Sequence, residues 1–312
     1  MLQSLDEKIV LPFSFCRYDK EIPVLFLIDL NKKMKWLSFA RVPYIYNTAK
    51  FLEEYLYTPN EGILFEGCNK AVANQLSDNG YEILKTGQEA IFDLQYDHFK
   101  KKSLKELIRR GNRGKQFEEI PFSTEAKDRL QKFRYECAHG KEPQLKYLFN
   151  DELESFNRLF VIKDENDIWY GAFMLSDKEI YYAQTELILR RKRAPVGVME
   201  ALIFYIFNKL KKEGYGYWSL GGVPFTVYEE TLFSKEGVIN LVGRRLRFAY
   251  NYKGLYFFKN KFNPIWIDYY FCFKPRLTLS ILIKVLFKTN LHKLIINKLP
   301  HILYIGKINK GS

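Results

Sequence analysis

The order of predicted elements between residues 159 and 222 constrains the fold more than any other feature of this sequence. Two apolar stretches flank Asp-Glu-Asn-Asp and predict a hairpin, and a third strand leads into a basic loop that contains a glycine. A helix follows and ends at a glycine, before one more strand. The predicted strands cover residues 159–163, 169–175, 180–189 and 217–220, and the predicted helix covers residues 198–213. This order favours an α/β (α+β) fold with a mixed sheet.

The first 120 residues alternate in a similar way. Strands are predicted over residues 24–29, 62–66, 81–84 and 89–94, and helices over residues 48–57, 69–78 and 99–110. Thr86 and Gly87 are expected to form a turn between the last two strands. A further helix is predicted over residues 124–137, shortly after Pro121.

The order found between residues 159 and 222 is that of an acyltransferase domain of the GNAT type. Because a weaker version occupies the first 120 residues, we expect tandem GNAT-like domains, each a mixed central sheet flanked by helices. The first would span residues 1–120, and the second, residues 121–275, would carry the active site. Residues 276–312 would form a basic amphipathic tail.

Two segments account for the positive charge of the chain. The formal net charge is +13; residues 98–115 hold eight Lys and Arg against one acid, and residues 276–312 hold seven and no acid. Concentrated cations indicate anionic partners such as nucleic acid, phosphorylated ligands or an anionic membrane. A nucleic-acid backbone would gain from the first segment through counterion release, although a merely solvated basic face is the alternative.

The cysteines and histidines show no pattern typical of a metal or redox site. The four cysteines are scattered, which suits a reducing compartment, and the four histidines have no partners for a nucleophilic triad. We expect no metal and no cofactor. The first residues do not resemble a signal peptide, and no uncharged apolar run approaches the ~20 residues that span a bilayer. The sequence therefore predicts a cytoplasmic protein that positions an already activated acyl donor.

Residues 250–270 combine nine aromatic residues and three lysines with one acid. A buried segment would not desolvate three ammonium groups, and a solvated loop would not expose nine rings. We therefore expect a wall with an apolar back and a cationic front formed by Lys253, Lys259 and Lys261. An aromatic core segment whose lysines reach water is the alternative.

Residues 190–197 place four consecutive cations and a glycine between a predicted strand and a predicted helix start. Backbone N–H groups at a helix start are unpaired and favour anions, so Arg190, Arg193 and Gly197 are candidates for phosphate binding. A solvated basic loop is the alternative. Glu186 lies in the preceding strand, where it could bind an amine, act as a base or pair with the nearby arginines.

Residues 277–299 form a largely apolar stretch that ends before Pro300. Lys284, Lys288 and His292 recur at four-residue spacing and would share one helical face. This pattern is typical of an interfacial helix on anionic lipid. A helix packed on the body of the protein is the alternative.

Five short motifs follow one another along residues 81–270. They lie at residues 87–94, 107–113, 186–199, 219–224 and 254–269. The first reads Gly-Gln-Glu-Ala-Ile-Phe-Asp-Leu, the fourth Ser-Leu-Gly-Gly-Val-Pro, and the last contains Lys-Asn-Lys-Phe-Asn-Pro-Ile-Trp. In this order the motifs resemble the catalytic domain of the phosphatidylglycerol lysyltransferases, the multiple peptide resistance factor group, and their DUF2156 relatives. The family pattern has Gly-x-Glu-Ala, Leu-Gly-Met-Ala-Pro and Lys-x-Lys-Phe-x-Pro-x-Trp at these places.

The resemblance implies tandem GNAT-like domains related to the Fem peptidyltransferases. It implies transfer of an amino acid from aminoacyl-tRNA to a phosphatidylglycerol-like head-group hydroxyl at the inner membrane surface. Aminoacyl-tRNA and an anionic phospholipid membrane are the implied partners, and a separate membrane flippase is a candidate partner. Expected catalytic residues are Glu186, Lys259, Lys261 and Tyr256. Expected substrate-binding residues are Arg190, Arg193, Gly197, Ser219, Gly221, Asn251, Lys253 and Trp266, and expected tRNA-binding residues are Arg109, Arg110, Arg113 and Lys115.

Three positions depart from the family pattern, since Glu186 replaces Asp, Gly222 replaces Met and Asp268 replaces Arg. The amino acid and the acceptor therefore stay open. Two alternative functions also remain: an acyltransferase that uses acyl-coenzyme A, and a non-catalytic relative that binds membrane or RNA. The spacing of Arg193 and Gly197 differs from that of coenzyme A-binding loops, which disfavours the first alternative.

Overall fold

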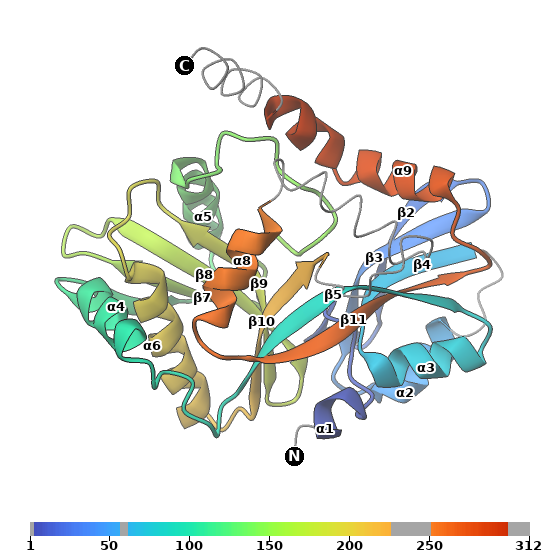
Figure 1. The fold of residues 1–312 in the computed structure, drawn as a ribbon, viewed down its shortest axis with the longest axis horizontal. Coiled ribbons are helices and arrows are strands. Elements are labelled where there is room, and N and C mark those ends of the chain that lie inside the picture. The colour runs from blue at the N-terminus through green and yellow to red at the C-terminus, as the bar shows by residue number, and fades with distance from the viewer. Residues whose placement is uncertain (1–2, 57–61, 226–250, 299–312) are drawn as a thin grey trace, which may run out of the picture.

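One mixed sheet runs through the described part of the chain. The structure is a computed structural model that describes residues 3–56, 62–225 and 251–298, and in it eleven strands form a single sheet (Figure 1). The strand order is β1-β3-β4-β11-β5-β10-β9-β8-β7-β6, with β2 paired to β3 off this path. The expected α/β class with a mixed central sheet and flanking helices is confirmed.

The strands alternate with helices along the sequence. The strands are β1 Phe15–Tyr18, β2 Val24–Asn31, β3 Met34–Pro43, β4 Gly62–Cys68, β5 Glu82–Asp93, β6 Gln116–Ile120, β7 Arg158–Lys163, β8 Trp169–Glu179, β9 Tyr182–Arg190, β10 Tyr217–Pro224 and β11 Ile265–Lys274. The helices are α1 Gln3–Asp6, α2 Thr48–Tyr55, α3 Lys70–Asp78, α4 Lys102–Asn112, α5 Thr124–Glu136, α6 Val198–Lys212, α8 Tyr252–Asn260 and α9 Leu279–Lys288. None of the helices in these described ranges is long and apolar enough to cross a membrane.

The strands and the helix between residues 159 and 222 follow one another in the predicted order. β7 and β8 form the expected antiparallel hairpin, β8 pairs with β9, and α6 connects β9 to the parallel strand β10. The GNAT-type order of strands and helix is therefore present in the second half of the chain.

The expected turn at Thr86 and Gly87 is wrong, because β5 continues through both residues. A Cβ atom on Gly87 would lie 2.4 Å from the carbonyl oxygen of Val223 and 2.5 Å from the hydroxyl oxygen of Tyr269. The glycine therefore allows β5 to pass close to its neighbours β10 and β11. Close approach of another chain segment, and not a turn, explains the glycine in this strand.

The C-terminal strand joins the first half of the chain. β11 lies between β4 and β5 and pairs antiparallel with both, whereas β6, from residues 116–120, pairs with β7 of the second half. β5 and β10 connect the halves, so the sheet crosses the expected boundary at residue 120 without a break. The division into domains of residues 1–120 and 121–275 stays a prediction.

The helices bury aromatic residues against different parts of the sheet. α4 and α6 pack together over a core that includes Phe92, Phe207 and Trp218. α2 and α3 cover another core around Phe51 and Phe65 at the opposite end of the sheet (Figure 1). Burial of such side chains is the main stabilising contribution to this architecture.

A partly buried ion pair connects β1 to β8 of the second half. Arg17, which is 4% exposed, donates to the carboxylate of Glu179 at 2.6 Å and to the carbonyl oxygens of Pro43 and Tyr46. Thr48 also donates to Glu179. Arg17, Tyr46, Thr48 and Glu179 line a surface cavity of about 520 Å³, but their polar groups satisfy one another, so we assign them a structural role.

Glu66 on β4 gives the fold a pH-dependent element. Its side chain is 8% exposed, and burial raises the pKa of its carboxyl group to about 8. The folded protein therefore holds this proton at neutral pH, whereas an exposed glutamate would release it near pH 4.5.

We expect Glu66→Gln to flatten the pH dependence of stability. Because the folded pKa is raised, the contribution of Glu66 is fully present below pH 4.5 and is lost as the pH rises through about 8. Relative to the variant, the wild type should lose about 3–5 kcal/mol of unfolding free energy between pH 5 and pH 9. Urea unfolding at both pH values measures this, and parallel stability curves would contradict it.

Candidate active site

The parallel strands β9 and β10 separate at Ser219. They pair only over three positions, which join residues 182–184 to residues 217–219. Beyond Ser219, β10 pairs only with β5 on its other side, and the register shifts between Ser219 and Gly222. Gly221 adopts a φ of +85°, which is favourable for glycine and costly for other residues. This irregularity leaves the carbonyl groups of Gly221 and Gly222 open to a side chain.

Lys259 of α8 fills the opening. Asn251 caps the helix by accepting a hydrogen bond from the Gly254 amide at 2.9 Å. Nζ of Lys259 donates to the carbonyl oxygens of Gly221 at 2.8 Å and Gly222 at 3.0 Å. The side chain is 3% exposed, and burial lowers the pKa of its amine to about 7 against the opposing effect of the Glu89 carboxylate. Near neutral pH the amine is therefore present in both protonation states.

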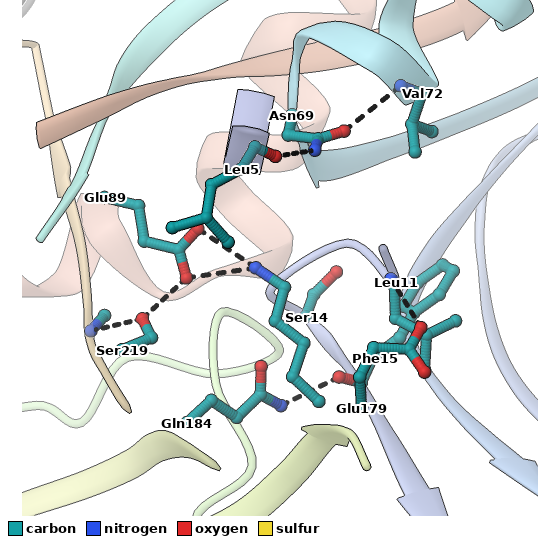
Figure 2. Close-up of polar contacts among 12 residues, drawn as sticks. Leu5, Leu11, Ser14, Phe15, Asn69, Val72, Glu89, Glu179, Gln184 and Ser219 are labelled. Carbon is teal, nitrogen blue, oxygen red and sulfur yellow. Dashed lines mark hydrogen bonds and ion pairs between the residues drawn. The ribbon is translucent and has the colours of Figure 1, made fainter. Parts of the chain in front are cut away.

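A buried ion pair between β5 and β8 lies next to the residues that hold Lys259. Glu89 on β5 and Lys178 on β8 are 3% and 1% exposed, and Nζ lies 3.0 Å from the nearer carboxylate oxygen. Ser219 donates to Glu89 at 2.6 Å and accepts from the Gly221 amide at 3.0 Å (Figure 2). A continuous set of hydrogen bonds thus connects Lys178 to the glycines that hold Lys259.

Glu186 lies on β9, two residues beyond the last residue that pairs with β10. It accepts hydrogen bonds from the hydroxyl of Ser176 and, at 2.9 Å, from the Gln184 amide. Burial raises the pKa of its carboxyl group to about 7, although these hydrogen bonds oppose the shift. Glu186 and Lys259 have separate partners. Glu186 lies on β9 beyond the last residue paired with β10, and the Lys259 amine contacts β10 beyond Ser219. Two groups with pKa values near 7 are suited to proton transfer at neutral pH.

Within the aromatic segment of residues 250–270, residues 252–260 form α8 and residues 265–270 begin β11. Tyr256 and Trp266 stack with their ring centroids 4.7 Å apart, and the Trp266 indole donates to Asn260 at 3.2 Å. Lys253 is exposed, and Lys261 pairs with Glu200 of α6 at 2.8 Å. The expected cationic front is wrong for Lys259, whose side chain is buried. Hydrogen bonds to two carbonyl groups compensate for the cost of burying its amine.

The basic helix α4 and the basic loop of residues 190–197 lie side by side in the structure. α4 packs on α6, and a Cβ atom on Gly111 would lie 2.1 Å from the carbonyl oxygen of Gly197 and 2.8 Å from the amide of Val198. The C-terminal end of the basic helix thus lies against the start of α6, beside the loop of residues 190–197. Gly197 makes this contact, and its expected role in phosphate binding stays a prediction.

The cations of these segments differ in how freely they could bind a ligand. Arg109 and Arg110 both lie near Glu106, at 2.8 and 3.7 Å. Lys115 lies over the Tyr170 ring at 4.5 Å, and Arg190 donates to the Ala194 carbonyl oxygen at 2.9 Å. Arg113 and Arg193 are exposed. The expected tRNA-binding and phosphate-binding roles of these residues stay predictions.

Sequence reasoning missed the roles of Glu89 and Lys178. Glu89 is the glutamate of the Gly-x-Glu-Ala motif, so a signal was present, but no role followed from it. Lys178 stands between Asp177 and Glu179 near the end of a strand, a context typical of an exposed lysine. The two charges come together because the strands lie in the order β5-β10-β9-β8 in the sheet.

Removing one partner of the Glu89–Lys178 pair should destabilise the protein strongly. We expect Lys178→Met to lower the unfolding free energy by about 3–5 kcal/mol, because it leaves a buried carboxylate without its cation. The double variant Glu89→Gln/Lys178→Met should lose less than the single variant. Urea unfolding of the wild type, Lys178→Met, Glu89→Gln and the double variant measures this coupling, and additive effects would rule it out.

The contact between α4 and α6 should not tolerate a methyl group. We expect Gly111→Ala to lower the unfolding free energy by about 2–3 kcal/mol through overpacking. Gly216→Ala is a matched control, because a Cβ atom there would meet nothing within 4 Å. Thermal unfolding compares the two variants, and equal melting temperatures would show that the helices are not in close contact.

Comparisons with known proteins agree with this structure. The family described as phosphatidylglycerol lysyltransferase, C-terminal, matches residues 45–273. The phosphatidylglycerol lysyltransferase of Bacillus subtilis (strain 168) is 25% identical over 246 residues, which are 74% of this chain but only 28% of that protein.

Two solved structures share the fold. L-PGS from Bacillus licheniformis superposes with a TM-score of 0.63 and 21% identity, covering 85% of each chain. The DUF2156 domain of a putative lysylphosphatidylglycerol synthetase from Agrobacterium fabrum gives 0.62 and 20%, covering 86% of this chain and 85% of that chain. The resemblance predicted from the five motifs is confirmed, and this chain belongs to the phosphatidylglycerol lysyltransferase C-terminal family.

Proposed function

We propose that this protein transfers an amino acid from aminoacyl-tRNA to the head-group hydroxyl of a phosphatidylglycerol-like lipid at the inner membrane surface. Family membership supports the reaction class, although the chain spans only about a quarter of the Bacillus subtilis relative. The single observation that carries the proposal is the buried amine of Lys259, held by two carbonyl groups where β9 and β10 separate.

The reaction moves one proton from the lipid hydroxyl to the leaving ribose oxygen and passes through an oxyanion that must be stabilised. The lipid hydroxyl oxygen attacks the ester carbonyl carbon, the bond from that carbon to the terminal ribose oxygen breaks, and the hydroxyl proton ends on the ribose. Neutral Lys259 accepts the proton, and the resulting ammonium group stabilises the developing charge and returns the proton to the leaving oxygen. A pKa near 7 makes both steps accessible at neutral pH.

The remaining expected residues take supporting roles in the proposal. Glu186 binds the amine of the aminoacyl group or assists deprotonation. The stacked rings of Tyr256 and Trp266 shape the lipid pocket, while exposed Lys253 and the half-exposed Lys261 bind the lipid phosphate. In the active site, Ser219, Gly221 and Asn251 act by positioning Lys259.

The basic residues at the end of α4 and in the loop before α6 bind the donor. Arg113 and Arg193 are exposed and lie on neighbouring segments, so one RNA backbone can contact both. Arg109, Arg110, Lys115 and Arg190 extend this surface, and a separate membrane flippase is a candidate partner for the product.

The acyl-coenzyme A alternative is less well supported. The spacing of Arg193 and Gly197 differs from that of coenzyme A-binding loops, which disfavours acyl-coenzyme A as the donor. Calorimetry with coenzyme A separates the two donors, because tight binding would favour the alternative.

The decisive experiment mixes the protein with charged tRNAs and phosphatidylglycerol vesicles and analyses the lipids by mass spectrometry. We expect an aminoacyl-lipid with at least one charged tRNA, and a rate that rises about tenfold from pH 6 to pH 8 with a midpoint near 7. Lys259→Met should slow transfer by about 100-fold or more, because it removes the proton acceptor.

Lys212→Met, at the exposed end of α6, is the matched control and should keep the wild-type rate. Circular dichroism is used to check that both variants are folded. No aminoacyl-lipid with any charged tRNA would remove the proposal, and full activity of Lys259→Met would remove the assigned mechanism.

A further inference from the structure

Helix α9 is fixed to the protein along one face. Ile281 is 5% exposed and packs with Val285 into a core of β2–β5 and β11 residues. The end of the helix is tied to a preceding loop, because the Thr289 carbonyl oxygen accepts from the Lys146 amide at 3.1 Å and Asn290 donates to the Gln144 carbonyl at 3.2 Å. Figure 1 shows α9 along the outside of the molecule next to β2. The helix is therefore held against the body of the protein along one face and at its C-terminal end.

The other face of α9 presents apolar side chains to solvent. Ile283 and Phe287, one helical turn apart, are 46% and 56% exposed. Ile296, in the helical stretch of residues 291–298 that follows, is 63% exposed. Large apolar side chains grouped on one exposed helix mark an interaction surface more often than scattered ones.

Lysines flank these apolar side chains, and acids do not. Residues 276–298 contain no Asp or Glu. Lys298 pairs with Glu142, but within the described chain no ion pair occupies Lys284, Lys288 or Lys293. Lys284 lies three residues before Phe287, a spacing that makes the two side chains neighbours on the helix surface, and Lys288 lies one turn after Lys284. The row of lysines therefore borders the row of apolar side chains.

We propose that Ile283, Lys284, Phe287, Lys288 and Ile296 form a docking surface for an anionic lipid bilayer. The apolar side chains enter the boundary between head groups and acyl chains, and the ammonium groups pair with lipid phosphates. The combination of unpaired cations with apolar side chains fits anionic lipid better than an apolar protein partner, which would leave the lysines unpaired. The proposal concerns membrane docking and holds whether or not the protein transfers an amino acid.

Vesicle flotation of the full chain tests the docking surface. We expect at least tenfold stronger binding to vesicles that contain phosphatidylglycerol than to phosphatidylcholine vesicles, and weaker binding at higher salt. Ile283→Asp/Phe287→Asp should reduce binding at least tenfold. Lys284→Ala/Lys288→Ala should reduce binding and its salt dependence. Ile180→Asp is the control, since Ile180 is 65% exposed at the β8–β9 turn, and should bind like the wild type.

Each other outcome overturns the proposal. Unchanged binding by the double aspartate variant would show that α9 is not the contact, and equal binding to both vesicle types would remove the role of charge. No vesicle binding by the folded wild type, or capture of a protein partner instead, would also reject it. Transfer measured with detergent-dispersed lipid separates docking from catalysis: loss of docking leaves that rate unchanged, and failure of the transfer reaction leaves vesicle binding unchanged.

Discussion

The rest of the site depends on how a lysine amine is accommodated inside the sheet. Burial of an ammonium group is costly unless acceptors surround it. Here β10 loses its pairing with β9 after Ser219, and the carbonyl groups of Gly221 and Gly222 become the acceptors for Lys259. Ser219 accepts a hydrogen bond from the Gly221 amide and donates one to Glu89 of the Glu89–Lys178 pair, which fixes the irregular backbone of β10 at these glycines. The amine is therefore positioned by backbone groups whose own geometry is held by three strands.

The continuity of the sheet explains why α8 can place that lysine. α8 is followed directly by β11, which is inserted between β4 and β5 in the first half of the protein. The helix thus spans from the second half, where it contacts β10, to the first half, where its chain continues (Figure 1). The halves contribute jointly to the site: β5 provides Glu89, β8 provides Lys178, and β10 provides Ser219 and the two glycines.

Much of the fold could be predicted from local patterns. The hairpin around residues 164–167, the helix at 198–212 and the strand before Gly221 have strong local signals, and the structure contains all three. The split of β5 at Gly87 was wrong because a glycine that allows close packing between strands looks like a turn glycine in the sequence. The site was predicted in part, since Lys259, Ser219 and Gly221 do meet. The partnership of Glu89 and Lys178 could not be predicted, because it depends on which strands are neighbours across 89 residues.

The protonation state of Lys259 is the central claim and can be measured directly. Lysine labelled with ¹³C at Cε would be followed by NMR from pH 5 to pH 11, with the Lys259 signal assigned by its absence in Lys259→Met. A buried amine whose hydrogen-bond partners are neutral carbonyl groups should titrate with a pKa of about 7, well below the ordinary lysine value of 10.5. A midpoint above 10 would show that Lys259 is an ordinary charged lysine and would contradict the account.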